Sequence, residues 1–266
     1  MIDIVTVVFK PELEILKLQA RSLDQYVEGI KSIKVVINQD TNLESQIDRC
    51  WWGSYHDRVQ IIQRNQFGST WSDNGWVSQQ ALKIMTAAIC DCEWAVILDA
   101  KTIFVRPFEP LPHRPAVGQL NIYPVFEHSR EIANQLFGID LQHQLGPGGV
   151  PFIINTQHAR DMIVWIQNHT KQSFADWFQQ QGRLTEFILY SAWIQYRTGS
   201  LNIIYNTETT NIVPVNLCHS EVERFEQKLS QMPAATTVSI HRNAWTQLAD
   251  DHKKQYMDFL HSRGIQ

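Results

Sequence analysis

The sequence lacks the motifs that mark several common classes of protein. It contains no Gly-x-Ser-x-Gly, no P-loop, no Gly-x-Gly-x-x-Gly and no cysteine pair at zinc-binding spacing. The sequence therefore lacks the usual motif evidence for a serine hydrolase, a P-loop nucleoside triphosphatase, a dinucleotide-binding oxidoreductase or a zinc protein. No run of about 18 apolar residues occurs, which argues against a membrane-spanning helix and leaves contact with a membrane surface open.

An excess of basic charge is also missing. The chain has 23 lysines and arginines against 27 acidic residues, a formal net charge of -4. A nucleic-acid-binding face needs clustered positive charge, so nucleic acid is not expected as a partner. An anionic ligand would need local cations and the amides of helix N-termini.

Cysteine is scarce, with four residues in 266. Cys90 and Cys92 are separated by a single residue, too close for an ordinary disulfide. We expect all four cysteines to be free thiols in a reducing cytoplasm. Residues 1–9 are apolar but have no basic segment and no small-residue cleavage site, so we expect no signal peptide there.

What is present indicates a folded α/β protein. Hydrophobic residues make up 44% of the chain and charged residues 19%, enough apolar material for a sizeable core. Two strands rich in β-branched residues, Ile2–Phe9 and Ile33–Asp40, flank a helix predicted over Pro11–Tyr26. This βαβ opening continues with strands at Val59–Gln63 and Trp94–Asp99 and a helix at Gly75–Cys90.

The second part of the chain is predicted to be more irregular and richer in helices. The prolines at 107, 110, 112 and 115 indicate an extended connection. Strands are expected at Val117–Tyr123, Phe152–Asn155, Leu201–Ile204 and Ile212–Val215. Helices are expected at Phe126–Phe137, Thr156–Thr170, Ser173–Gln181 and Thr185–Tyr196, with a polar helical tail from Asn243 onward.

The most informative stretch is Trp94–Pro107, where an apolar run ends at Asp99 and a second apolar run closes with Arg106 and Pro107. In open α/β sheets, ligands bind at the carboxyl ends of the strands. Asp99 can there bind a metal, a ribose or a substrate hydroxyl, or simply shape the turn. The apolar runs on both sides favour the first interpretation.

Lys101, two residues further on, is either a solvated turn lysine or a fixed cation for a phosphate group. A helix begins at Gly75, and helix N-termini present free amides to anions. Gln79 and Lys83 follow on its first turns. Taken alone, Lys83 resembles an ordinary exposed helix lysine, and Trp76 a core residue.

Two earlier strand ends are expected to lie beside Asp99. The first comprises Thr6 to Lys10, including Phe9, and the second carries Asn38 and Asp40. In a doubly wound sheet these ends line the nucleotide crevice. Asn38, Gln39 and Asp40 suit hydrogen bonds to a base or ribose, and equally suit plain turn chemistry.

Three later positions also have two interpretations each. Gly148 and Gly149 allow close approach of the backbone to a sugar, or merely a hinge. Glu186 follows Thr185, a good N-cap residue, and an acid in the first turn is favoured by the helix dipole. Glu186 would be a general base if it faced the cleft. His241 follows a predicted strand end and is, alone, more often structural than a ligand.

Taken together, these segments resemble bacterial glycosyltransferase-like proteins of GT-A type, which use nucleotide-sugar donors. The resemblance covers most of the chain and rests on the order of six segments: Asp3–Phe9, Gln19–Leu23, Gly75–Lys83, Leu98–Pro107, Gly148–Phe152 and Thr185–Tyr190.

The resemblance implies one GT-A-like domain over residues 1–266, a Rossmann-type, mostly parallel sheet flanked by helices. Residues 1–107 would form the nucleotide-binding half and residues 108–266 the acceptor side. In that pattern Thr6, Phe9, Asn38, Asp40, Gly75, Gln79, Lys83, Asp99 and Lys101 contact the donor, and Gly148 and Gly149 the acceptor.

The resemblance also assigns chemical roles. Asp99 matches the first acid of the Asp-x-Asp motif, which holds Mn²⁺ or Mg²⁺ on the donor diphosphate, and His241 matches a late histidine that completes the metal shell. Glu186 matches the acid that acts as base in inverting members. Lys101 stands where the second acid would be, and an ammonium cannot ligate a metal.

The leading hypothesis is therefore a cytoplasmic glycosyltransferase that moves a sugar from a nucleotide donor to a glycan, lipid or small-molecule acceptor. Three consequences of Lys101 remain open: a metal held by Asp99, His241 and phosphates, a lysine replacing the metal charge, or an inactive relative that binds nucleotide sugars or acts as a scaffold. A nucleotidyltransferase ranks lower, since those enzymes usually need paired acids.

Overall fold

The computed structural model describes residues 1–41, 43–68, 70–72, 74–109, 126–141, 151–206 and 212–266. Within them, a central five-stranded sheet has the order β3-β2-β1-β4-β6. The strands are β1 (Ile2–Val8), β2 (Ile30–Ile37), β3 (Val59–Gln63), β4 (Trp94–Asp99) and β6 (Phe152–Asn155). The first four are parallel, and β6 pairs antiparallel with β4. The predicted α/β class with a mostly parallel sheet is confirmed.

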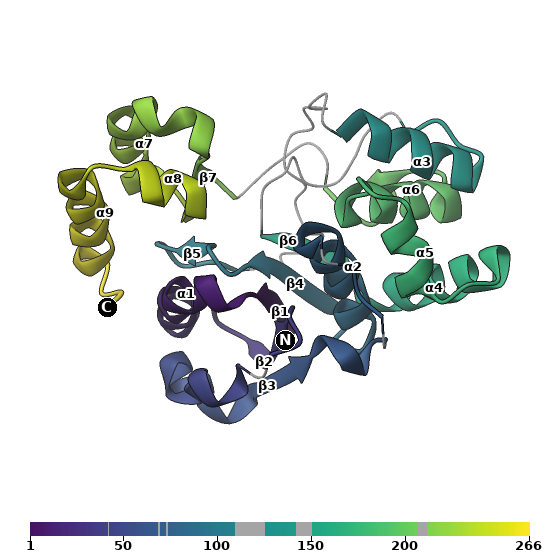
Figure 1. Ribbon diagram of the computed structural model, residues 1–266, viewed down its shortest axis with the longest axis horizontal. Helices are drawn as coiled ribbons and strands as arrows, with labels where there is room; N and C mark the ends of the chain where they lie inside the picture. The colour runs from purple at the N-terminus through teal and green to yellow at the C-terminus, as the bar shows by residue number, and fades with distance from the viewer. Residues whose placement is uncertain (42, 69, 73, 110–125, 142–150, 207–211) are drawn as a thin grey trace.

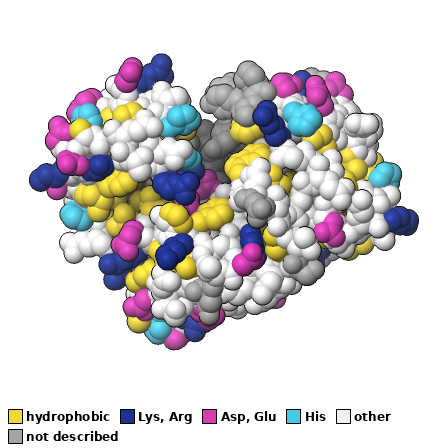
Figure 2. Space-filling view, viewed as in Figure 1, with side chains coloured by type: hydrophobic (Ala, Val, Ile, Leu, Met, Phe, Trp, Pro, Cys, Tyr) yellow, Lys and Arg dark blue, Asp and Glu magenta, His cyan; other side chains and the backbone are white. Residues whose placement is uncertain are grey.

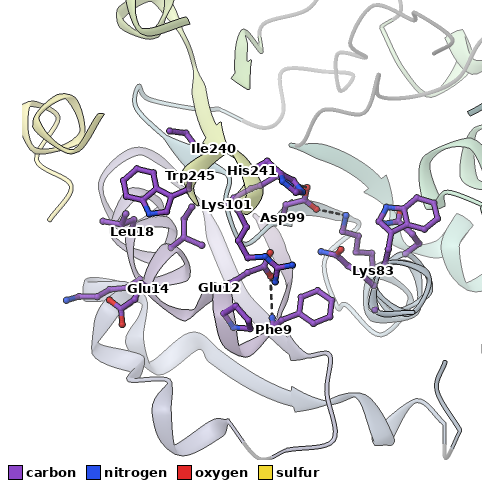
Figure 3. A pocket seen from close by; sticks show the side chains of 18 of the residues that line it. Phe9, Glu12, Glu14, Leu18, Lys83, Asp99, Lys101, Ile240, His241 and Trp245 are labelled. Carbon is purple, nitrogen blue, oxygen red and sulfur yellow. Dashed lines mark hydrogen bonds and ion pairs between the residues drawn. The ribbon is translucent and has the colours of Figure 1, made fainter. Parts of the chain in front are cut away.

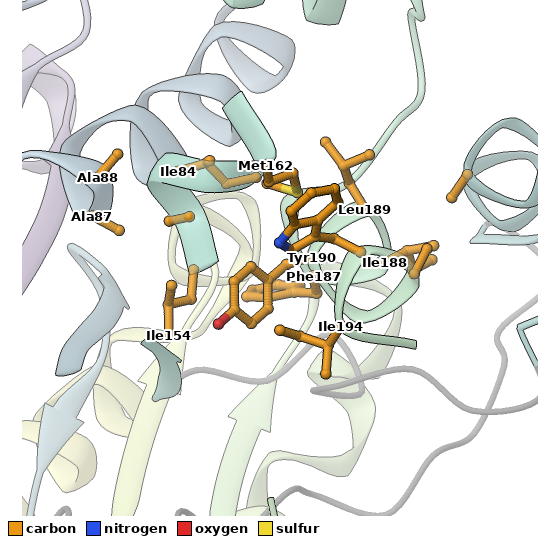
Figure 4. Packing of buried hydrophobic residues seen from close by; sticks show 14 of the residues in the cluster. Ile84, Ala87, Ala88, Ile154, Met162, Phe187, Ile188, Leu189, Tyr190 and Ile194 are labelled. Atoms are coloured by element: carbon orange, nitrogen blue, oxygen red, sulfur yellow. The ribbon is translucent and has the colours of Figure 1, made fainter. Parts of the chain in front are cut away.

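Helices cover both faces of this sheet because successive side chains of a buried strand point to opposite sides. Val5 and Ile97 face a cluster that includes residues of α2, α4, α5 and α6. Ile4 and Val96 face the other side, where α1 and Trp52 pack. Figure 4 shows part of the first cluster, with α6 side chains against those of α2 and α4.

The helices of the described residues fall into two groups (Figure 1). Next to the sheet lie α1 (Leu13–Tyr26), α2 (Gly75–Ala88), α3 (Glu127–Phe137), α4 (Thr156–Thr170), α5 (Phe174–Gln180) and α6 (Glu186–Thr198). At the other end lie α7 (Phe225–Gln231), α8 (Arg242–Gln247) and α9 (Asp250–Ser262). Short 3₁₀ helices occupy Lys10–Glu12, Glu44–Gln46, Arg49–Arg58, Arg64–Gln66, Leu201–Ile203, His219–Arg224 and Met232–Ala234.

A second, three-stranded sheet brings the C-terminal part of the chain back to the first part. Its order is β5-β8-β7, with β5 (Ile103–Phe104), β7 (Pro214–Leu217) and β8 (Thr237–Ile240). Ile103 and Val105 share one hydrophobic cluster with residues from Val215 to Ile265. The segment after β4 and the segment after β8 therefore lie at the same place, and they build the candidate site together.

Most predicted elements are confirmed within one to three residues, and the exceptions have local causes. The strand expected at Leu201–Ile204 is wrong: Leu201–Ile203 form a 3₁₀ turn, capped by the Ser200 side chain. The second strand ends at Ile37, because Asn38 turns to bind helix α2. The tail is helical but amphipathic, with Tyr256 and Leu260 buried. The strand expected at Val117–Tyr123 and the prolines at 110, 112 and 115 lie outside the described residues.

Two further findings bear on the composition. Among the described residues, no helix is both long and apolar enough to cross a membrane. All four cysteines are free thiols, with Cys50 and Cys218 exposed and Cys90 and Cys92 buried.

Candidate functional site

A cavity of about 1100 Å³ opens at the carboxyl ends of β1 and β4. Figure 2 shows this face hollowed between the lobe that carries α7, α8 and α9 and the rest of the molecule. Charged side chains such as Glu12, Asp99 and Lys101 lie among apolar ones such as Phe9, Leu18 and Trp245 (Figure 3). The described lining includes Phe9, Glu12, Ile15, Leu18, Gln39, Gly75, Trp76, Gln79, Gln80, Lys83, Asp99, Lys101, Thr185, Phe187, Ile240, His241, Arg242 and Trp245.

The carboxylate of Asp99 sits at the tip of β4 on a braced turn. The Thr102 amide donates to the Asp99 carbonyl at 2.9 Å. From helix α1, the buried Gln19 amide donates to the carbonyls of Asp99 and Thr102 at 2.5 and 3.2 Å. The turn therefore holds two side chains, Asp99 and Lys101, at the cavity wall.

Lys83 is the centre of a network of charges. Its side chain is only 2% exposed, and its ammonium lies 2.6 Å from Asp99 Oδ1 and 2.8 Å from Glu186 Oε1. Lys101 Nζ lies 3.2 Å from Asp99 Oδ2. The Gln80 amide lies against the Glu186 carboxylate, and the orientation that satisfies both groups turns its nitrogen toward Oε1 and Oε2. The network joins α2, β4 and α6 into one rigid unit.

The burial of these charges shifts their pKa values in directions set by their partners. Burial alone raises the pKa of Asp99, but the ammonium groups of Lys83 and Lys101 outweigh it and hold the pKa well below its usual range. Burial opposes the charge of Lys83, yet Asp99 and Glu186 raise its pKa. Burial raises the pKa of Glu186 despite its contact with Lys83. Asp99 and Lys83 are thus firmly ionised at neutral pH.

These residues do not suit a divalent metal. Both carboxylate oxygens of Asp99 face ammonium groups. At an effective dielectric constant of about 20, two unit charges about 4 Å apart repel by about 4 kcal/mol, and a divalent ion doubles this. His241 caps α8, and its Nδ1 accepts from the Asn243 amide at 3.2 Å. The described residues also contain no group of three His, Cys, Asp or Glu side chains placed to hold a metal.

Of the remaining predicted donor residues, Phe9, Gly75 and Gln79 line the cavity. A Cβ on Gly75 would lie 2.7 Å from Phe9 Cε1, so only glycine allows this close approach of the ring to the helix start. Trp76 is 42% exposed at the cavity, so its interpretation as a core residue is wrong. The alternative interpretation of Lys83 as an ordinary exposed helix lysine is also wrong, because its side chain is 2% exposed.

Three other predicted donor residues lie away from the described cavity lining. Thr6 is fully buried within β1. Asn38 is also buried, donates to the Gly75 carbonyl at 2.9 Å and accepts from the Ser78 hydroxyl, so its contacts are structural. Asp40 is exposed and forms an ion pair with Arg64 at 2.7 Å.

Of the residues predicted for catalysis, metal binding and acceptor contact, only some line the cavity. Glu186 is fully buried and bound to Lys83, behind the cavity wall, so its position does not favour direct contact with an acceptor. Thr185 caps α6, as predicted. His241 lines the cavity, and burial together with Lys101 lowers its pKa. Gly148 and Gly149 lie outside the described residues.

The polar lining residues that the sequence analysis did not single out as site residues are Glu12, Glu14, Lys17, Gln80, Arg242 and Gln266. Burial and the nearby Asp99 raise the pKa of Glu12. Arg242 is exposed, and no ion pair or hydrogen bond of its guanidinium is found among the described residues. Gln80 could have been found from its helical spacing to Lys83, but Arg242 had no signal other than following His241.

Comparisons with known proteins relate this fold to sugar-transferring enzymes. The model of one protein family, described as a family of unknown function (DUF6492), matches residues 10–245. No curated protein matches the sequence. A solved structure of the galactosyltransferase LgtC, in complex with donor and acceptor sugar analogues, has a TM-score of 0.55 at 11% identity and covers 98% of this chain and 95% of that one.

An active-site mutant of LgtC gives a TM-score of 0.54 at 12% identity over the same shares of the two chains. Mouse xyloside xylosyltransferase 1 reaches only 0.45 at 12% identity, with 91% of this chain and 99% of that chain covered. At such low identity the likeness concerns the fold. The GT-A-like architecture expected from the sequence is thereby confirmed.

Proposed function

The chain belongs to DUF6492, a family of unknown function, and we propose that it is a glycosyltransferase that uses a nucleotide-sugar donor. The observation that carries the proposal is the cavity at the carboxyl edge of a β3-β2-β1-β4 parallel sheet, with Asp99 at the tip of β4. This edge is where nucleotides bind in open α/β sheets. The related galactosyltransferase structure contains donor and acceptor sugar analogues, which supports the same use here.

The proposed donor site follows the cavity from one wall to the other. Phe9 and Gln39, at the ends of β1 and β2, would contact the nucleoside, and Lys101 the diphosphate. Gln79 and Asp99 would meet the sugar or ribose hydroxyls. Most of this proposed site comes from residues 1–107, and the segment at Arg242 would complete it.

In the proposed reaction, the bond between the sugar's anomeric carbon and the phosphate oxygen breaks. Its electron pair remains on that oxygen, where nearby cations stabilise the developing charge. The acceptor oxygen forms the new bond and releases its proton to solvent. Because Glu186 is buried, we propose that it positions Lys83, and through it Asp99, instead of acting as the base.

A second candidate function is a protein of the same fold that binds nucleotide sugars without turnover. The burial of Glu186, the acid proposed as base, favours it. Incubation with a panel of nucleotide sugars, followed by measurement of released nucleoside diphosphate, separates the two candidates. Release above that of an Asp99→Asn variant supports the enzyme. Binding without release supports the second candidate, and no binding to any member of the panel rejects both.

A further inference from the structure

Two cationic side chains, Lys101 and Arg242, line the cavity near Asp99. Lys101 stands two residues after Asp99, on the turn braced by Gln19, and its ammonium lies 3.2 Å from Asp99 Oδ2. Its side chain remains 28% exposed. It therefore keeps a fixed position next to Asp99 while still reaching the cavity (Figure 3).

A second cation lines the same cavity. Arg242 begins helix α8, directly after strand β8, and lines the same cavity. Because β5, which follows Lys101, pairs with β8, which precedes Arg242, the two cations lie in one part of the cavity. A guanidinium and an ammonium in one cavity suit a phosphate group, because an arginine fork matches two phosphate oxygens and a lysine adds a point charge.

The carboxylate between them is already neutralised. Lys83 and Lys101 occupy its two oxygens, so Asp99 brings no unpaired negative charge that would draw a metal ion or repel a phosphate. Lys83 also pairs with Glu186. Among these residues, Lys83, Lys101 and Arg242 carry three positive charges against two negative charges on Asp99 and Glu186, so one positive charge is in excess and favours an anionic ligand.

We propose that this protein binds the diphosphate of its nucleotide ligand directly through Lys101 and Arg242, without a divalent metal ion. This inference rests on the proposed function, because it concerns how the same donor site holds its ligand. It predicts that chelators leave nucleotide binding intact, in contrast to a site in which a metal joins the protein to the phosphates.

The test is a titration of the purified chain with UDP, GDP and ADP by calorimetry, in EDTA and again in MnCl₂. The wild type is expected to bind at least one of them with dissociation constants that agree within about twofold in the two buffers. Binding that EDTA weakens by tenfold or more, and that Mn²⁺ restores, would overturn the inference while leaving the proposed function standing. No binding in either buffer would reject both.

Variants show whether the named cations are responsible. Lys101→Gln and Arg242→Gln are each expected to weaken binding by about tenfold or more, because each removes one charge-assisted contact to phosphate. Lys254→Gln, on the exposed face of α9, serves as the matched control and is expected to bind like the wild type. Lys101→Asp is expected to lose binding in EDTA and to recover part of it in MnCl₂.

Each variant's melting temperature is measured beside its affinity, so that loss of folding is not mistaken for loss of binding. Equal affinity of the wild type, Lys101→Gln and Arg242→Gln would overturn the assignment of the two residues. The comparison of EDTA with MnCl₂ in the wild type needs no variant and remains decisive if a variant fails to fold.

Discussion

Replacement of Lys83 by methionine isolates the energetics of the buried charge network. The substitution keeps a long apolar side chain but removes the ammonium that lies 2.6 Å from Asp99 and 2.8 Å from Glu186. Asp99 keeps Lys101 as a partner and is 22% exposed, so solvent and Lys101 limit the free-energy cost of leaving its carboxylate without Lys83. Glu186 is 0% exposed, and of its partners in the network among the described residues it keeps only the Gln80 amide. Most of the loss in the free energy of unfolding is therefore expected to arise at Glu186.

Removal of one partner of a buried ion pair typically costs about 3–5 kcal/mol, because the other charge is left without compensation. We expect the free energy of unfolding of Lys83→Met to fall by this amount at neutral pH. Since a domain has about 5–15 kcal/mol of stability in total, the variant should be close to unfolding at ambient temperature. Urea denaturation followed by circular dichroism measures the difference.

The stability loss of Lys83→Met should depend on pH in a direction set by the pKa of Glu186. Burial already raises the pKa of Glu186 above its ordinary value of 4.5 when Lys83 is present. Without Lys83 the folded carboxyl takes up a proton more readily than the unfolded one, so stability rises as the pH falls toward that ordinary value. The destabilisation should therefore shrink between about pH 7 and pH 5.

Two comparisons make the reasoning refutable. The double variant Lys83→Met, Glu186→Leu should recover most of the lost stability, because a buried pair replaced by apolar residues is often neutral. Lys101→Met, the matched control at a partly exposed pair, should lose about 1 kcal/mol or less. A loss below about 1 kcal/mol for Lys83→Met at neutral pH, or no recovery in the double variant, would refute the account.

Three further predictions concern the supports of the site and the thiols. Gln19→Ala leaves the buried carbonyls of Asp99 and Thr102 without their side-chain donor, so the free energy of unfolding in urea should fall by about 1–3 kcal/mol, and nucleotide affinity should fall with it. Unchanged affinity would mean that the turn does not need this brace. Thr185→Ala removes the cap of α6, which should lower the free energy of unfolding by about 1 kcal/mol, whereas Thr185→Ser should retain most of it. Of the four thiols, the exposed Cys50 and Cys218 should react with a thiol reagent in the native protein, while Cys90, whose pKa burial raises to about 12, and the buried Cys92 should react only after denaturation. Rapid reaction of all four would contradict the burial.

The sequence by itself determined the central sheet and the position of Asp99. Strands such as Trp94–Asp99 are continuous apolar runs because parallel strands are covered on both faces, and this signal is local. The turn after Asp99 and the cap at Thr185 also depend on neighbouring residues. Where a local polar bond competed with strand propensity, as Ser200 does beside Leu201, the prediction failed.

Only the tertiary structure decided which charges meet. Helical spacing puts Lys83 on a face of α2, but it does not reveal that Glu186, 103 residues later, is packed against that face. Folding therefore turned an apparently exposed lysine into a buried one, and an expected base into its partner. Arg242 reaches the cavity because β8 pairs with β5, a long-range contact without a local pattern. A substitution such as Lys101 for an acid can be seen in the sequence, but its effect depends on neighbours that the fold supplies.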